Sequence, residues 1–250
     1  MKTFNQERLW IIGASSGIGA ALAQELDRRG ANLVLSARSA DKLELLNSEL
    51  SGNHLVLPLD IRDEGAMAEV VMAAFDGPVD RIVFLAAAYE PMWLKSADLE
   101  TTQSIFHTNL FGLMNFLRHS LPALEQQGRG QIAVCGSVAG YVGLPKGQPY
   151  SATKAATQSI VESLKSEAPD FLDIKLISPG FVKTPMTNKN DFKMPMVIEP
   201  KEAAVAIVDG LKRKSFEIHF PKKFTLFLKF LRLLPYGLSF KLINRLLKGA

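Results

Sequence analysis

Residues 8–19 read RLWIIGASSGIG, an apolar run that ends in a glycine-rich turn. A helical pattern of apolar residues follows over residues 18–29, so the turn is expected to join a strand to a helix. Glycines at such a turn let the backbone approach a ligand closely, and the free amides of the first helical turn attract an anion. The alternative is a tight turn without a ligand. We favour a site for a dinucleotide pyrophosphate, with these contact residues: Gly13, Ser15, Ser16, Gly17, Ile18 and Gly19.

Beyond this turn, short apolar runs alternate with helical patterns along the chain. The runs are rich in Val, Ile and Leu and lack polar alternation, which indicates strands covered on both faces. Right-handed crossovers between such strands give a doubly wound sheet. The sequence therefore predicts an α/β, Rossmann-like fold with a seven-stranded parallel sheet and helices on both faces. The expected strands are 8–13, 32–36, 54–59, 81–86, 131–136, 173–178 and 216–220, and the expected helices are 18–29, 39–50, 64–75, 98–126, 150–167 and about 200–212.

The composition fits one sizeable globular core. The chain has 250 residues, of which 47% are hydrophobic and 22% charged, unlike the apolar-poor composition of disordered chains. Cys135 is the only cysteine, and the four histidines lack the spacing of metal ligands, so we expect neither an internal disulfide nor a metal site. Polar residues directly precede the first apolar run, which predicts that no signal peptide is present and that the protein is cytoplasmic.

The charge is distributed unevenly along the chain. Residues 211–250 hold ten Lys or Arg against the single acid Glu217, a net charge of +9, so residues 1–210 carry −5 of the total of +4. A mildly acidic main body does not suit a nucleic-acid partner. The basic character belongs to the C-terminal segment, where we expect any anionic partner to bind.

The end of the second predicted strand bears on the choice of cofactor. It reads Leu35-Ser36-Ala37-Arg38, without the carboxylate that holds the ribose hydroxyl of NAD. A guanidinium matches the geometry of a phosphate. Arg38, with Ser15 or Ser16, therefore predicts binding of NADP(H) through its 2′-phosphate, with NAD(H) as the alternative cofactor. A solvated surface arginine is the alternative interpretation of Arg38.

Three residues in the second half of the chain predict proton-transfer chemistry. Ser137 follows the fifth predicted strand, and Tyr150 and Lys154 lie four residues apart on one face of a predicted helix. A phenol has a pKa near 10, so acid–base chemistry near neutral pH requires a shift of about three units. An adjacent ammonium and a cationic nicotinamide carry the charge that lowers such a pKa. The spacing therefore predicts that Lys154 assists Tyr150.

The glycine-rich turn, Ser137, the pair Tyr150-x-x-x-Lys154 and the segment Ser178-Pro179-Gly180 together resemble the short-chain dehydrogenase/reductase family over about residues 7–220. The resemblance implies that Ser137 holds the substrate oxygen, that Tyr150 transfers the proton, and that Lys154 binds the nicotinamide ribose and lowers the pKa of Tyr150. It also implies that Asn109 organises a water-linked proton path. Further cofactor contacts implied in the same way are Asp60, Ile61, Tyr150, Lys154, Pro179, Gly180, Val182 and Thr184.

Two positions depart from the family pattern. Ile12 stands where Thr usually precedes the first glycine, and Phe84-Leu85-Ala86-Ala87 replaces the usual Asn-Asn-Ala-Gly. Neither change removes a proton-transfer group. The second change removes side-chain hydrogen bonds that brace the central sheet, and it places a β-carbon at Ala87 beside the expected cofactor.

The C-terminal segment extends past the last predicted strand. We divide the chain into a dinucleotide-binding and catalytic domain at 1–220 and a basic amphipathic helical tail at 221–250. Two short helices are expected around Pro235-Tyr236-Gly237, and charged residues interrupt the apolar run, which disfavours a membrane span. The tail is expected to lie on an anionic membrane surface, to cover the substrate pocket or to form a subunit interface. The cations on the polar side of its second helix are Lys241, Arg245 and Lys248.

These features predict an NADP-dependent oxidoreductase that interconverts a ketone or aldehyde and an alcohol, with Tyr150 as general acid/base. The segment 181–199 lacks a clean period and contains three methionines and two phenylalanines, which predicts a binding loop or lid over an apolar or lipid-like small-molecule substrate. A loop that packs on the core is the alternative interpretation. By resemblance, the helices at 98–126 and 150–167 are expected to form a homodimer or homotetramer. A peripheral position at the inner face of a membrane is the second expectation for localisation.

Two alternatives from other classes stay open. The first is a non-catalytic NADP-binding module that docks on a membrane or a partner protein. The second is a soluble metabolic carbonyl reductase whose tail forms an oligomer interface. The four residues Asn109, Ser137, Tyr150 and Lys154 argue against the first alternative, because a binding module has no need of proton-transfer groups.

Overall fold

The computed structural model describes residues 4–50 and 53–248, with side chains through Ile243 in the last helix. Within these described residues, seven strands form a single sheet in the order β3-β2-β1-β4-β5-β6-β7, and every neighbouring pair is parallel. This order is that of a doubly wound sheet and confirms the predicted fold class. The strands are β1 (Arg8–Ile12), β2 (Asn32–Ser36), β3 (Leu55–Val56), β4 (Arg81–Phe84), β5 (Gly130–Cys135), β6 (Leu172–Pro179) and β7 (Glu217–Phe220).

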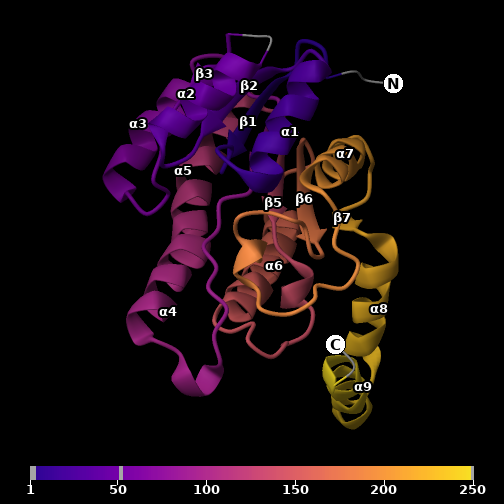
Figure 1. Cartoon of the computed structure of the whole chain (residues 1–250). Coiled ribbons are helices and arrows are strands. Elements are labelled where there is room, and N and C mark those ends of the chain that lie inside the picture. Colours follow the sequence, from indigo (N-terminus) through magenta and orange to yellow (C-terminus); the bar gives the residue numbers. More distant parts are fainter. Residues whose placement is uncertain (1–3, 51–52, 249–250) are drawn as a thin grey trace.

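Helices cover both faces of the sheet (Figure 1). The helices are α1 (Gly17–Arg28), α2 (Ala40–Glu49), α3 (Glu64–Ala74), α4 (Leu99–Phe106), α5 (Gly112–Gln127), α6 (Tyr150–Glu167), α7 (Pro200–Leu211), α8 (Lys222–Leu233) and α9 (Tyr236–Lys248). One buried cluster joins the sheet to α1, α2 and α7, and a second joins it to α3, α5 and α6. The side chains of β1 alternate between the two clusters, with Leu9 and Ile11 in the first and Trp10 and Ile12 in the second. Because both faces are buried, the strands carry no polar alternation.

The third predicted strand is shorter than expected. The sequence predicts residues 54–59, whereas only Leu55–Val56 is a strand. Pro58 has no backbone N–H to donate to a sheet ladder. The chain still follows β2, because the amide of Leu57 donates to the carbonyl of Leu35 at 2.9 Å and that of Leu59 donates to Ala37 at 3.0 Å.

The long helix predicted at 98–126 is divided by a π-helical turn. Residues His107–Phe111 form this turn between α4 and α5. A π-turn inserts one residue into the helical repeat and often marks a functional position. Here it contains Asn109, whose side chain is 2% exposed and turned toward the segment after β4.

The C-terminal tail forms the two helices that the sequence predicts. α8 buries Phe224, Leu228 and Leu231, which form a third apolar cluster with Val138 and Tyr141 from the loop after β5. The two helices lie along one side of the molecule, with α9 at its lower end (Figure 1). The side chains of Arg245 and Lys248 lie outside the described part of α9, and the division of the chain at residue 220 stays a prediction. Within the described residues, every helix is too short or too polar to cross a bilayer.

Candidate active site

The glycine-rich turn is fixed by close contacts between backbone segments. Gly13 and Gly17 have positive φ angles of +92° and +55°, a region that favours glycine. A β-carbon at Gly19 would lie 2.1 Å from the carbonyl oxygen of Gly13, and one at Gly13 would lie 2.8 Å from the amide nitrogen of Ala86. Glycine is therefore required at these positions by the fold of the turn itself.

The N-terminus of α1 presents unpaired amides. The side chain of the N-cap residue Ser16 accepts no capping hydrogen bond, and the first turn contains no acidic residue. The first amides of a helix have no partner within the helix and carry the positive end of its dipole. This arrangement suits an anion such as a pyrophosphate.

A cleft of about 600 Å³ lies along the carboxyl ends of β1, β2, β4, β5 and β6, where doubly wound folds bind ligands. Every cofactor contact predicted from the sequence lines it: Gly13, Ser15, Ser16, Gly17, Ile18, Gly19, Arg38, Asp60, Ile61, Tyr150, Lys154, Pro179, Gly180, Val182 and Thr184. Ser137 lines it as well. The cleft thus brings the glycine-rich turn and the proton-transfer residues together, while Asn109 lies behind its wall.

Sequence analysis missed one cation in the cleft. Lys42 lines it together with Arg38, and its place in the first turn of α2, directly after the second strand and the N-cap Ser39, is the signal that could have revealed it. Neither side chain forms an ion pair with another described residue. Asp60, the acid beside them, is engaged by Arg62 at 2.6 Å, and this hydrogen bond holds the pKa of the Asp60 carboxyl below its usual value. Both cations are therefore available to an anionic ligand.

Ser137, Tyr150 and Lys154 meet at the inner end of the cleft. The hydroxyl of Ser137 accepts a hydrogen bond from the amide of Ala139 at 3.1 Å, and its own proton lies within reach of the Tyr150 phenol oxygen. The Lys154 ammonium donates to the carbonyl of Cys135 at 2.7 Å and lies 5.6 Å from the ring centre of Tyr150. The remaining ammonium protons are thus available to groups in the cleft.

Burial sets the protonation of Tyr150 and Lys154. Burial raises the pKa of the Tyr150 phenol well above its usual value, and a hydrogen bond with Ser137 opposes part of this shift. Burial also lowers the pKa of the Lys154 ammonium. The phenol is therefore protonated at neutral pH, which suits a proton donor. The sequence analysis expected a lowered phenol pKa, which depends on Lys154 together with a cationic nicotinamide, so that expectation stays a prediction.

Asn109 clamps the chain after β4. Its side-chain amide donates to the carbonyl of Ala88 at 2.9 Å and accepts from the Ala88 amide at 2.6 Å. The same amide donates to the Thr153 hydroxyl at 3.0 Å, next to Lys154. The side chain thereby ties the cleft wall at Ala86 and Ala87 to helix α6. A water-linked proton path through Asn109 stays a prediction.

The two departures from the family pattern are filled by apolar packing. Ile12 and Phe84 are 1% and 2% exposed, and the Phe84 ring packs 5.1 Å from that of Phe116. Leu85 packs against the first core cluster and lines the cleft. At Phe84 and Leu85, where the family usually has asparagine side chains, the central sheet is therefore packed by hydrophobic contacts.

A smaller chamber of about 100 Å³ joins the cleft at Ser137 and Tyr150. The Tyr89 ring packs edge-on against the Tyr150 ring at 4.9 Å, and the Tyr89 hydroxyl donates to the side-chain carbonyl of Asn190 at 2.5 Å. A salt bridge from Lys189 to Glu90 at 2.6 Å joins the same two segments. These two contacts, which we call the latch, fasten residues 189–190 of the segment 181–199 beside the chamber. No local pattern in the sequence indicates the latch. The apolar walls include Val138, Leu144, Phe181, Met186 and Phe192.

The tail supports the chamber from behind. The Tyr141 hydroxyl donates to Glu217, and Lys229 of α8 forms a salt bridge with the same carboxylate. The Phe224 ring lies 5.7 Å from the ring of Phe181, a chamber residue. α8 therefore packs on two segments that line the chamber without entering it.

Comparison with known proteins decides the family. Residues 7–194 match the short chain dehydrogenase family. The chain belongs to this family. An uncharacterized oxidoreductase of Staphylococcus haemolyticus is 34% identical over 82% of this chain and 90% of its own length. The ketoacyl reductase HetN of Nostoc sp. is 29% identical over 87% of this chain and 79% of its own.

Solved structures of short-chain dehydrogenases share the fold. One from Burkholderia cenocepacia, in complex with NADP, has a TM-score of 0.78 and 25% identity over 87% of this chain and 89% of that chain. One from Burkholderia phymatum, in complex with NAD, has a TM-score of 0.81 and 19% identity over 92% of this chain and 94% of that chain. Family membership confirms the enzyme class predicted from the sequence, an NAD(P)-dependent short-chain dehydrogenase/reductase that acts on CH–OH groups.

Proposed function

We propose that the protein is an NADP-dependent oxidoreductase that interconverts a ketone or aldehyde and an alcohol. The observation that carries this proposal is the convergence of Ser137, Tyr150 and Lys154 on the cleft that also contains the glycine-rich turn. Proton-transfer groups and an anion cradle in one cleft are the two parts that hydride chemistry on a carbonyl requires.

The residues of the cleft divide the reaction between them. NADP(H), when bound, supplies or accepts the hydride. The Ser137 hydroxyl donates a hydrogen bond to the substrate oxygen. The protonated phenol of Tyr150 donates its proton to that oxygen during reduction and recovers it during oxidation. Lys154 holds a ribose hydroxyl and places positive charge beside the phenol, which lowers the cost of forming the phenolate.

The preference for NADP(H) over NAD(H) rests on the adenosine end of the cleft. Arg38 and Lys42 line it there, and Asp60, the acid among the described residues that line this cleft, is already paired with Arg62. Two free cations match the double charge of a 2′-phosphate. The short chain dehydrogenase of Burkholderia cenocepacia was solved with NADP, which agrees with this preference.

The substrate is proposed to be apolar and lipid-like. The chamber beside Tyr150 has walls of Val138, Leu144, Phe181 and Met186, which suit a hydrocarbon chain. The relative named ketoacyl reductase HetN supports an acyl-chain substrate. A carbonyl at Ser137 with its chain in the chamber satisfies both the polar and the apolar parts of the site.

Two rival functions remain, and one turnover experiment separates them from the proposal. The predicted homodimer or homotetramer and the predicted cytoplasmic location are compatible with the proposed function and with both rivals, so neither property distinguishes them. A soluble metabolic carbonyl reductase whose tail forms an oligomer interface would reduce short ketones as well as long ones, and a non-catalytic NADP-binding module would reduce none.

The experiment follows NADPH oxidation with a series of ketones of rising chain length, for the wild type and for Tyr150→Phe. We expect turnover that increases with chain length, and a loss of about 100-fold or more in kcat in the variant. Equal rates in the two proteins would reject Tyr150 as the proton donor. Turnover of short ketones alone would reject the lipid-like substrate.

A further inference from the structure

The two tail helices expose an unusual density of large apolar side chains. α8 already packs its inner side on the body through Phe224, Leu228 and Leu231. A helix that is apolar on both sides leaves one side in water unless a partner covers it. We call the exposed large apolar side chains of the two helices together the outer face; they are Leu226, Phe227, Phe230, Leu233, Tyr236, Leu238 and Phe240.

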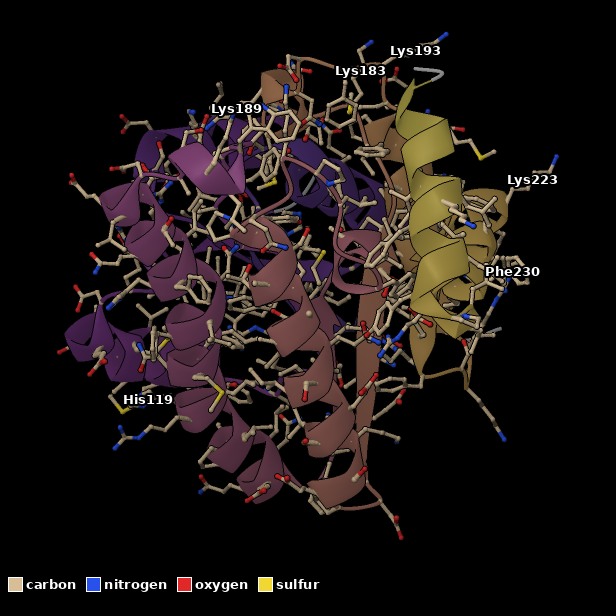
Figure 2. All side chains as sticks on the ribbon, turned by 90° about the horizontal axis from the view of Figure 1, so that it is seen from below. His119, Lys183, Lys189, Lys193, Lys223 and Phe230 are labelled. Atoms are coloured by element: carbon tan, nitrogen blue, oxygen red, sulfur yellow. The ribbon has the colours of Figure 1, made fainter. Side chains whose placement is uncertain are left out.

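Figure 2 shows how the outer face is oriented. The labelled Phe230 and Lys223 of α8 lie at the edge of the molecule and point away from the sheet. Leu233 and Tyr236, where the two helices meet, are 82% and 80% exposed. These side chains are therefore open to a large partner rather than enclosed in a groove.

The charges around the outer face have one sign. The exposed cations of the two helices are Lys222, Lys223, Arg232 and Lys241, and none of them forms an ion pair with another described residue. Lys229, by contrast, is paired with Glu217. The sequence contains no Asp or Glu after Glu217. The partner of this face must therefore supply negative charge together with an apolar surface.

We propose that the outer face docks on an anionic lipid membrane, with α8 and α9 lying in the headgroup region. Anionic headgroups balance the free lysines and arginines, and the acyl boundary covers the phenylalanines and leucines. A second copy of the chain is disfavoured as the occupant, because a two-fold contact places the same patch against itself and brings like charges together.

Docking of this kind has a consequence for the reaction proposed above. The inner side of α8 packs on Val138 and Phe181, which line the chamber, and on Tyr141 beside it. A docked protein therefore holds its substrate chamber about one helix diameter, roughly 10 Å, from the lipid surface. This consequence rests on the proposed function, whereas the docking itself does not.

Flotation with vesicles tests the proposal on the full chain. Vesicles of phosphatidylcholine mixed with phosphatidylglycerol are compared with vesicles of phosphatidylcholine alone. We expect the wild type to float with the mixed vesicles, and to bind about tenfold less to the neutral ones and in high salt. The double variant Phe230→Ser, Leu233→Ser is expected to lose about tenfold or more in binding. The control Leu45→Ser, Met72→Ser removes two equally exposed apolar side chains from α2 and α3 and is expected to bind as the wild type does.

Three results would overturn the proposal. The first is a wild type that does not float with the mixed vesicles. The second is equal flotation of the wild type and the Phe230→Ser, Leu233→Ser variant. The third is an oligomer of the wild type that this variant dissociates, because a second copy of the chain is then the occupant. The NADPH dissociation constant of each preparation reports on the cofactor site separately, so failure of docking is distinguishable from failure of the enzymatic proposal.

Discussion

The N-terminal strand, turn and helix at residues 8–28 and the C-terminal region at residues 181–243 are built by different kinds of contact. In the first, backbone lies against backbone, as at Gly13 and Gly19, where even a methyl group would collide. In the second, side chains connect separate segments, as in the bond from Tyr89 to Asn190 and the salt bridge from Lys229 to Glu217.

This difference separates the part of the protein that binds the cofactor from the parts that are expected to select the substrate. The contacts at Gly13 and Gly19 leave no room for a side chain, so the cradle for the cofactor is fixed by the fold. Side-chain contacts can change one residue at a time, so the chamber walls and the tail are free to set the substrate and the location of the enzyme. Substitutions in the first region are expected to abolish binding, and those in the second to adjust it.

The largest effect is expected at the glycine-rich turn. Gly19→Ala places a β-carbon 2.1 Å from the Gly13 carbonyl, which forces the turn apart at a cost of about 1–3 kcal/mol or more and displaces the amides of α1. We expect the variant to lose measurable NADPH binding in a fluorescence titration. Gly237→Ala is the control, because its β-carbon would meet open space. Wild-type affinity in Gly19→Ala would show that the turn does not form the cradle.

The second effect concerns the two free cations of the cleft. Arg38→Ala and Lys42→Ala each remove a charge-assisted contact worth about 1.5–3 kcal/mol, so the dissociation constant for NADPH is expected to rise about 10- to 100-fold while that for NADH stays nearly constant. The same titration measures both. Lys165→Ala, an exposed lysine of α6, serves as the control. Tighter binding of NADH than of NADPH by the wild type would contradict the roles given to Arg38 and Lys42.

A smaller effect is expected at the latch beside the chamber. Tyr89→Phe keeps the ring against Tyr150 and removes only the bond to Asn190, a loss of about 0.5–1.5 kcal/mol. We expect KM for a long-chain ketone to rise about fivefold, with kcat within about twofold of the wild type. Steady-state kinetics separate the two constants. An unchanged KM would mean that the latch does not position the substrate.

The smallest effect is expected in the pH dependence of folding stability, through the salt bridge that joins Glu217 of β7 to Lys229 of the tail. Hydrogen bonds from Lys229 and Tyr141 lower the pKa of Glu217 below its usual 4.5, against the opposing effect of its burial. A carboxyl with a lowered pKa stabilises the folded state above the unfolded-state pKa, and this contribution disappears as the pH falls through the folded-state value.

Urea unfolding near neutral pH and below pH 4.5 measures this contribution. Because Lys229 is partly exposed, we expect Glu217→Gln to cost only about 1 kcal/mol at neutral pH. The loss of stability on acidification is expected to be smaller in the variant than in the wild type, since the variant has no carboxyl to protonate at this position. An equal loss in both proteins would place the acid response elsewhere.

Much of the cleft could be predicted from the sequence because its residues follow strands. In a parallel sheet the carboxyl ends of the strands share one edge, so Gly13, Arg38, Ser137 and Pro179 are placed together once the strands are recognised. The pair Tyr150 and Lys154 follows from helical spacing alone. These signals are local, and the fold converts them into one site.

The residues that sequence analysis missed depend on contacts between distant segments. Tyr89 and Asn190 are 101 residues apart, and no local pattern links them. The π-helical turn at Asn109 lies inside residues 98–126, a stretch that the sequence pattern predicts as one continuous helix. Glu217 stood out only as the single acid of a basic segment, and its pairing with Tyr141 and Lys229 is visible only in three dimensions. The oligomeric state stays a prediction.

The most direct test of the account is a crystal structure of the protein with NADP⁺ bound. We predict the pyrophosphate at the N-terminus of α1, the 2′-phosphate against Arg38 and Lys42, and the nicotinamide beside Tyr150, with α8 still packed behind the chamber. A cofactor bound in the opposite orientation, or outside the cleft that Tyr150 and the glycine-rich turn share, would contradict the account.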